Sequence, residues 1–347
     1  MHDVNMDERY TGYDAARTAA AVGPRGSRGW VRVWDADAVS FLHGILTNDV
    51  ASLVPGAWRY AAYLTPQGRM ISDMRVLRRA DDLVLETEPH VAQVLAQRFD
   101  ASIFTERVGL NFGFPWTGEA DGSAGRQDAE TIVVCGPAAP RMVASVLRND
   151  GLRLEIHHFA ELPREGGPLL LVGHDDLGTP AIDVTGSPDA CTRLVQDLHA
   201  AGASPLGTLA LEALRIEAGT SRFGVDMTED TIPLEAGIEG RAISFTKGCY
   251  VGQEVIIRIL HRGHGRVARR LVGLSLDGED VPSPGSPVCA AGRDVGAVTS
   301  AVFSPGLQRA IALGYVHRDA SASGTSVTVG AAGTPATVTD LPFKRPE

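Results

Sequence analysis

The alternation of apolar and polar residues first predicts short strands interrupted by helices. Trp30 to Trp34 alternate as in a strand, and Asp35 or Asp37 is placed to cap a helix that continues to Ile45. A turn signal, Pro66-Gln67-Gly68, then separates two further apolar runs. This set comprises strands at 30–34, 58–63, 70–77 and 83–85 and helices at 35–45 and 91–99. Such a meander with helices on one side is an α+β lobe.

A second set of elements follows a stretch rich in Gly, Ser and Ala at 118–127, which reads as a linker or exposed loop. A helix in this set is stopped by Gly202, and another ends near Gly219. The order of elements is similar to that of the first set, which hints at a repeated lobe. The set comprises strands at 131–134, 152–156, 169–172 and 181–184 and helices at 137–147, 189–200 and from 206 to near 219.

Beyond Gly265 the pattern changes to short strand-like runs separated by turns rich in Gly, Pro, Ser and Asp. This spacing predicts a small all-β barrel or sandwich. The predicted strands lie at 271–276, 295–303, 311–316, 326–329 and 336–338. We therefore expect an α+β protein with an N-terminal arm (1–25), two α+β lobes (26–117 and 118–265) and an all-β domain (266–347).

Composition narrows the possible functions. With 347 residues, 44% hydrophobic and 21% charged, the chain is expected to fold into two or three packed lobes. A net charge of −10 argues against broad nucleic-acid binding, and no apolar run approaches the length of a membrane span. Because the N-terminus also lacks the apolar core of a secretory signal, a cytoplasmic location is expected.

The four cysteines are far apart and form no CxxC pair. A disulfide framework is not expected, and neither is a self-contained zinc or iron–sulfur site, because both usually draw on clustered ligands. We predict no permanent metal site.

One cysteine lies in a chemically mixed motif, Lys247-Gly248-Cys249-Tyr250-Val251-Gly252-Gln253-Glu254. The spacing of Val251 to Leu260 predicts a helix with Cys249 at its first turn, where the helix dipole and the Lys247 ammonium would favour a thiolate. Gly248 and Gly252 would let the backbone approach a ligand. The motif is equally compatible with a cysteine that fills a tight turn, since free cysteines are often buried.

This octapeptide, KGCYVGQE, resembles the signature of the YgfZ family, folate-binding proteins related to the T-protein (aminomethyltransferase) of the glycine cleavage system. The resemblance covers most of the chain. DADAVSFLHGILTNDV and YAAYLTPQGRMISDMRV resemble the first lobe shared by both groups. LGTLALEALRIEAGTSRFGVDMTEDTIPLEAGI resembles the segment lining the folate channel of T-protein, and RGHGRVARRLVGL the entry to the third domain. The family resemblance implies a T-protein-like fold with tetrahydrofolate as cofactor.

The two branches imply different activities. T-proteins transfer an aminomethyl group from a lipoyl carrier with an aspartate that follows an Asn-Ala pair. The corresponding stretch, Leu85 to His90, has neither the pair nor the aspartate at that spacing, which argues against aminomethyl transfer. The YgfZ branch is implicated in tetrahydrofolate-dependent assembly or repair of iron–sulfur clusters, serving clients that include tRNA-modifying enzymes. There the resemblance makes Cys249 the working thiol, with Lys247 beside it.

The resemblance also implies candidate folate ligands. Asp183 matches the carboxylate that recognises the pterin, although a solvated strand-end aspartate is the more common situation. Arg215 matches a carboxylate-binding arginine, although an intrahelical pair with Glu212 is the simpler reading. The motif adds three further candidates: Tyr250, Gln253 and Glu254.

A strip of basic residues between Arg258 and Arg270 contains no acid. Through Arg262 it could hold a polyglutamate tail or attract a phosphate-bearing partner, or it could be a solvated face. Our first hypothesis is a folate-binding accessory factor for iron–sulfur proteins. The alternatives are a folate-dependent one-carbon transferase and a module whose basic strip docks tRNA or a protein.

Overall fold

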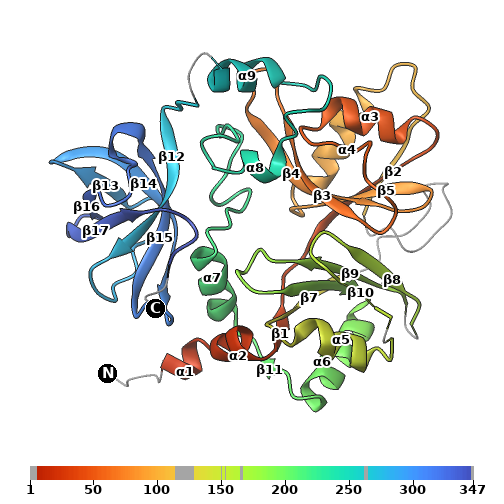
Figure 1. The fold of residues 1–347 in the computed structure, drawn as a ribbon, viewed down its shortest axis with the longest axis horizontal. Helices are drawn as coiled ribbons and strands as arrows, with labels where there is room; N and C mark the ends of the chain where they lie inside the picture. Colours follow the sequence, from red (N-terminus) through yellow and green to blue (C-terminus); the bar gives the residue numbers. More distant parts are fainter. Residues whose placement is uncertain are drawn as a thin grey trace.

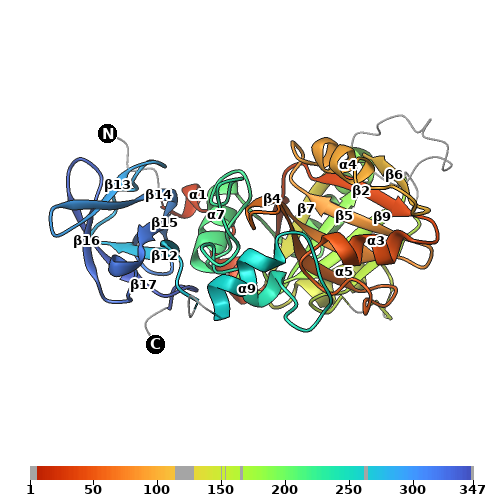
Figure 2. The same cartoon turned by 90° about the horizontal axis from the view of Figure 1, so that it is seen from above.

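The computed structural model describes residues 6–113, 129–149, 151–152, 154–164, 167–261 and 265–344. Three lobes surround a central segment: two α+β lobes lie on one side and a barrel on the other (Figure 1). The view from above separates the barrel from the two stacked lobes (Figure 2).

The first lobe is a five-stranded antiparallel sheet in the order β3-β4-β5-β2-β6. Its two helices bury their apolar faces against the sheet, in a core that includes Leu42, Leu95 and Phe99. The elements are β2 (Gly29–Trp34), α3 (Ala38–Ile45), β3 (Trp58–Leu64), β4 (Met70–Arg78), β5 (Asp82–Thr87), α4 (Ala92–Asp100) and β6 (Gly109–Phe112).

The second lobe has a six-stranded sheet in the order β11-β1-β7-β10-β9-β8. A core that includes Val134, Val143 and Leu194 fixes its two helices on one face of the sheet. The elements are β7 (Glu130–Cys135), α5 (Ala139–Val146), β8 (Phe159–Leu162), β9 (Leu169–His174), β10 (Ala181–Gly186), α6 (Pro188–Ala200) and β11 (Ser204–Pro205).

The two lobes repeat one plan. In each, a strand and a helix precede a three-stranded meander and a second helix, and the first strand pairs beside the last strand of the meander. The sheets face each other through Trp30, Trp58, Phe159 and Leu170, with the helices on the outer sides. The repeated lobe indicated by the sequence is confirmed.

The N-terminal segment differs from the expected arm. Its elements are α1 (Met6–Arg9), α2 (Tyr13–Thr18) and β1 (Ala21–Pro24). β1 lies inside the second sheet, antiparallel to β7 and parallel to β11. Tyr13 donates a hydrogen bond to Glu217 of the central segment at 2.6 Å. Small side chains of this segment fit between the second lobe and the barrel, and the segment is therefore buried. Its alanine-rich composition did not indicate this burial.

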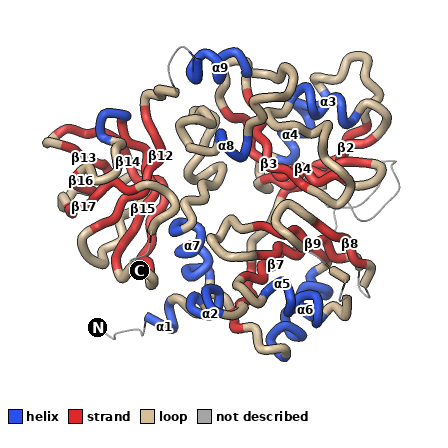
Figure 3. The backbone as a smooth tube through the Cα atoms, viewed as in Figure 1, coloured by secondary structure: helices blue, strands red, loops and turns tan. Residues whose placement is uncertain are grey.

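The central segment connects the second lobe to the barrel through α7 (Thr208–Glu217), α8 (Glu239–Ala242) and α9 (Gln253–His261). Figure 3 shows that loops make up most of this segment between α7 and α9. The C-terminal domain is a closed barrel in the order β12-β15-β14-β13-β16-β17, as the sequence predicted. Its elements are β12 (Arg269–Leu276), β13 (Pro287–Ala290), β14 (Arg293–Ser304), β15 (Arg309–His317), a 3-10 helix (Arg318–Ala320), β16 (Ser326–Val329) and β17 (Thr334–Thr339).

Some local predictions differ from the structure. The described residues of the predicted strand at 152–156 are not in a strand, and the edge strand β8 lies a few residues later, at Phe159–Leu162. The linker expected at 118–127 lies outside the described residues. Within the part of the chain that the structure describes, no helix is long and apolar enough to span a bilayer.

Candidate functional site

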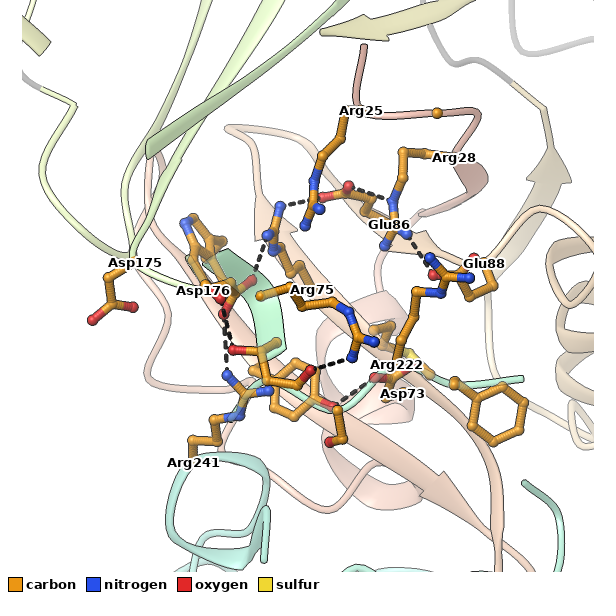
Figure 4. Close-up of a pocket in the computed structure, with 18 of the residues that line it drawn as sticks. Arg25, Arg28, Asp73, Arg75, Glu86, Glu88, Asp175, Asp176, Arg222 and Arg241 are labelled. Atoms are coloured by element: carbon orange, nitrogen blue, oxygen red, sulfur yellow. Dashed lines mark hydrogen bonds and ion pairs between the residues drawn. The ribbon is translucent and has the colours of Figure 1, made fainter. Parts of the chain in front are cut away.

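A cavity of about 590 Å³ lies where the two sheets meet the central segment (Figure 4). Its lining comes from the β1–β2 connection, strands β3, β4 and β5 with the residues after β5, the loop before β8, the β9–β10 turn, the end of α7 with the loop after it, and α8. A volume between about 300 and 1,000 Å³ is typical of sites for small molecules and cofactors.

The base of the cavity is a network of ion pairs centred on Arg75 of β4. Its guanidinium binds Asp183 of β10 at 2.8 Å, Asp176 of the β9–β10 turn at 2.6 Å and Glu86 of β5 at 3.2 Å. The same side chain lies over the ring of Trp58. Arg75 therefore joins the two sheets at the point where the cavity forms.

A second arginine, Arg28, organises the side of the cavity next to β5. It binds Glu86 at 2.8 Å and Glu88 at 2.7 Å. Burial alone would lower the pKa of Arg28, but the two carboxylates outweigh burial and raise it. Both acids are thus already neutralised by cations of the protein.

The pKa values of two further acids show how strongly the network favours their ionised forms. Burial would raise the pKa of Asp176, but Arg75, His174 and Arg241 lower it well below its usual range. Burial also opposes ionisation of Asp183, yet His174, Arg25 and Arg75 hold its pKa well below the usual value. The network is a preformed, charge-neutralised base rather than a set of free acids.

Asp73 of β4 is in a different situation. Its carboxylate accepts a hydrogen bond from the hydroxyl of Tyr60 at 2.6 Å, and it has no salt bridge with any cation among the described residues. Burial raises the pKa of Asp73, although the Tyr60 hydrogen bond, Arg28 and Arg241 oppose that shift. Arg241 lies over the Tyr60 ring, 4.5 Å from its centroid. Asp73 is thus a partly buried acid open to the cavity.

Arg222, in the loop after α7, is the cation of the cavity that, like Asp73, has no ion pair among the described residues. It lines the cavity and is exposed, and its guanidinium forms no ion pair with the acids that the structure describes. The other arginines of the lining each bind at least one carboxylate. The cavity thus offers an anion a free guanidinium.

The two folate ligands expected in the lobes are both occupied. Asp183 is buried, does not line the cavity and is held by Arg75, Arg25 and His174. Arg215 does touch the cavity, but its guanidinium binds Asp226 at 2.7 Å and Glu212 at 2.5 Å. The pair with Glu212, which the sequence offered as the simpler reading, is therefore present.

Lys247 of the octapeptide is a structural anchor. Its ammonium donates to the backbone carbonyl oxygens of His43, Leu46 (2.6 Å) and Asn48 (3.3 Å), at the C-terminal end of α3. A cation is favourable there because the last carbonyl groups of a helix lack partners. Burial lowers the pKa of Lys247 to about 8. Its contacts join the motif to the first lobe.

Cys249 is exposed and does not line the central cavity. Helix α9 begins only at Gln253, so the thiol lies before the first turn, contrary to our expectation. Gly252, with φ of 82°, approaches the β3–β4 turn, since a Cβ there would lie 2.5 Å from the carbonyl oxygen of Thr65. This glycine serves packing between segments. Its backbone does not approach the cavity.

The remaining motif candidates also lie away from the cavity. Tyr250 is buried in a core with residues of β3 and β4, and Lys247 lies over its ring. Gln253 starts α9, and the exposed Glu254 pairs with Arg258 at 2.7 Å. Arg262 lies outside the described residues. The structure therefore does not bring the motif and the two lobe candidates into one site.

The sequence prediction missed the residues that do meet in the cavity: Asp73, Tyr60, Arg75, Arg222 and Arg241. One signal was available. Strand β4 is otherwise apolar and buried, yet it carries Asp73 and Arg75. Charged residues inside a buried strand require partners, and such partners are often part of a site.

Comparison with known proteins places this geometry in a family. Residues 11–247 match the GCVT N-terminal domain, and residues 269–344 match the glycine cleavage T-protein C-terminal barrel domain. The chain is 30% identical to an aminomethyltransferase of Rubrobacter xylanophilus, over 98% of this chain and 88% of that protein. It is 31% identical to one from Streptomyces coelicolor, over 95% and 87%.

A solved structure agrees in fold. The glycine cleavage system aminomethyltransferase T of Bartonella henselae superposes with a TM-score of 0.83 at 22% identity, covering 96% of this chain and 89% of that one. The two matched domains together span both α+β lobes and the barrel. This chain belongs to the glycine cleavage T-protein family.

Proposed function

We propose that this protein binds a reduced folate, tetrahydrofolate or a one-carbon derivative of it, in the central cavity. The observation that carries the proposal is that one cavity of about 590 Å³ is lined by an acid, Asp73, and a cation, Arg222, neither of which has an ion pair among the described residues. A folate has a flat heterocycle with hydrogen-bond donors at one end and carboxylates at the other. The cavity offers a group suited to each.

The rest of the lining fits the same ligand. Tyr60 and Phe223 provide aromatic surface, and Arg222 provides the cation for a glutamate tail. The ion-paired base around Arg75 positions the two sheets without offering a free charge of its own. A bound tetrahydrofolate would supply nitrogen atoms that accept a one-carbon unit. The protein would bind and orient it and limit access of water.

The first candidate reaction is folate-dependent aminomethyl transfer. Relatives named aminomethyltransferase share about 30% identity over almost the whole chain, which favours this activity over the iron–sulfur role that the motif predicted first. The stretch from Glu86 to His90 still lacks the aspartate of that pattern. Incubation with tetrahydrofolate and an aminomethylated lipoyl carrier tests it, and formation of methylenetetrahydrofolate is the expected result.

The second candidate is support of iron–sulfur proteins in the cytoplasm, with Cys249 as the working thiol. The exposure of this cysteine outside the cavity favours it, because folate and a client could then bind at separate places. Cys249→Ala would keep folate affinity and lose support of iron–sulfur enzymes, including tRNA-modifying ones. Unchanged support in cells that carry only the variant would exclude the thiol from this role.

Titration calorimetry with tetrahydrofolate tests the proposal directly. We expect saturable binding to one site, and about tenfold weaker binding by Arg222→Ala, because a charge-assisted contact to a carboxylate is lost. Arg69→Ala is the matched control, since Arg69 is half exposed and lies outside this cavity. Heat of binding that is absent for the unmodified protein would contradict the proposal.

A further inference from the structure

We propose that Asp73 recognises the hydrogen-bond donor edge of the bound heterocycle, that is, the amino group and adjacent ring N–H of a 2-amino-4-oxo pyrimidine ring. The inference rests on the proposed function and assigns a specificity-determining residue to it. Sequence resemblance had given this role to Asp183, which the structure shows to be buried and ion-paired.

The other acids of the cavity are either ion-paired or exposed, which distinguishes Asp73 from them. Five carboxylates line the cavity. Three of them, Glu86, Glu88 and Asp176, are neutralised by arginines at 3.2 Å or less. Asp175 is exposed and lies at the edge of the group shown in Figure 4. Only Asp73 is both partly buried and without an ion pair among these five described side chains.

The backbone around Asp73 is held firmly. Asp73 lies within β4 and is paired with Ala62 of β3. Its carbonyl oxygen accepts hydrogen bonds from the hydroxyls of Ser72 and Thr87, both at 2.8 Å. A recognition group on a well-anchored strand can hold a ligand edge in a defined orientation.

The side chain itself is oriented by Tyr60, whose hydroxyl donates to Oδ2. That contact leaves Oδ1 available, together with the remaining lone pair of Oδ2. A carboxylate in this state can accept two parallel N–H bonds from a planar ligand edge. An amino-oxo pyrimidine has two adjacent donors with this spacing.

In the protein without ligand, the ionised form of Asp73 is energetically unfavourable. Burial raises the pKa of Asp73, which means that the surroundings disfavour its charge, and the nearest cations oppose the shift only partly. Asparagine would accept the same Tyr60 hydrogen bond without that cost. A ligand with two N–H donors supplies hydrogen bonds that would stabilise the ionised carboxylate. Buried acids with such a shifted pKa are often part of functional sites.

Two ligands and two variants test this inference. Tetrahydrofolate and its analogue with a methyl group in place of the 2-amino group are titrated against the unmodified protein, Asp73→Asn and the control Asp81→Asn, an exposed acid outside the cavity. We expect Asp73→Asn to bind tetrahydrofolate about 10- to 100-fold more weakly, and Asp81→Asn to differ by no more than about twofold. The unmodified protein should prefer tetrahydrofolate to the analogue about tenfold or more, and Asp73→Asn should lose that preference.

Thermal unfolding distinguishes a loss of ligand recognition from a loss of folding stability. Because the charge of Asp73 is disfavoured in the folded protein, Asp73→Asn should be at least as stable as the unmodified protein at pH 7. If the variant does not fold, the ligand preference of the unmodified protein still decides, and equal affinity for both ligands overturns the inference. Tetrahydrofolate binding that Asp73→Asn leaves unchanged also overturns it, with the proposed function intact. No binding by the unmodified protein overturns both.

Discussion

The central cavity and the octapeptide at 247–254 hold similar kinds of side chains in opposite circumstances. At the base of the cavity, acids and arginines from separate segments form ion pairs, and the pairs of Arg75 with Glu86 and Asp183 are buried. In the octapeptide, the Lys247 ammonium donates to backbone oxygens and lies over the Tyr250 ring, and Cys249 is exposed. A motif that is continuous in sequence can thus be a local anchor, while the charged lining of the cavity is assembled from distant residues.

The largest expected effect concerns the base of the cavity. Arg75→Met removes the cation shared by Asp183, Asp176 and Glu86, which leaves their charges buried and incompletely paired. We expect a loss of about 3 kcal/mol in the free energy of unfolding, because breaking one side of a buried ion pair is costly. Urea unfolding measures it.

Arg69→Ala is the control for that measurement, because the Arg69–Asp230 pair is exposed. Its removal should cost about 1 kcal/mol or less. Equal losses in the two variants would show that the buried network contributes no more than a surface pair.

Thiol reactivity should next distinguish the exposed thiol of the octapeptide from the thiols in the buried cores of the second lobe. Burial raises the pKa of Cys135 and of Cys191 to about 12, so each has roughly a thousandfold less thiolate than an ordinary cysteine at the same pH. We expect iodoacetamide to modify Cys249 in the native protein and to reach Cys135 and Cys191 only after unfolding.

Mass spectrometry of peptides from the alkylated protein gives the rate at each cysteine. Cys249→Ser should remove the fastest phase, with Cys289, which is partly exposed, as an internal comparison. Labelling of Cys249 as slow as that of Cys135 would contradict its exposed position.

The smallest effect concerns the anchor. Lys247→Met removes the hydrogen bonds to the carbonyl oxygens at the end of α3, with an expected loss of about 1–2 kcal/mol in the free energy of unfolding. The chain has one other lysine, the exposed Lys344, and Lys344→Met should leave stability unchanged. Thermal unfolding of the two variants compares them, and equal melting temperatures would argue that the anchor contributes nothing.

Much of the fold follows from the sequence because it is encoded locally. The alternation at Trp30 to Trp34 and the helical spacing at Val91 to Phe99 correspond to β2 and α4 within a residue or two. The place of β1 was not predictable in this way, because its pairing partners Cys135 and Ser204 are remote in sequence. Strand pairing over long separations has no local signature.

The site was less predictable for a different reason. Sequence supplies the carboxylates and guanidiniums, but their availability depends on which of them are already paired. Asp183 and Arg215 were reasonable choices by resemblance, and both are occupied by other residues of the protein. Asp73 and Arg222 carry no such partners among the described residues, and only three-dimensional proximity reveals the difference.

The position of β1 between β7 and β11 has a consequence for synthesis. After it leaves the ribosome, β1 cannot complete its sheet until Cys135, and then Ser204, have followed. Until that moment the first lobe can form while residues 21–24 wait without a neighbour. Deleting the N-terminal segment would therefore open the second lobe between two strands, with the damage appearing far from the cut.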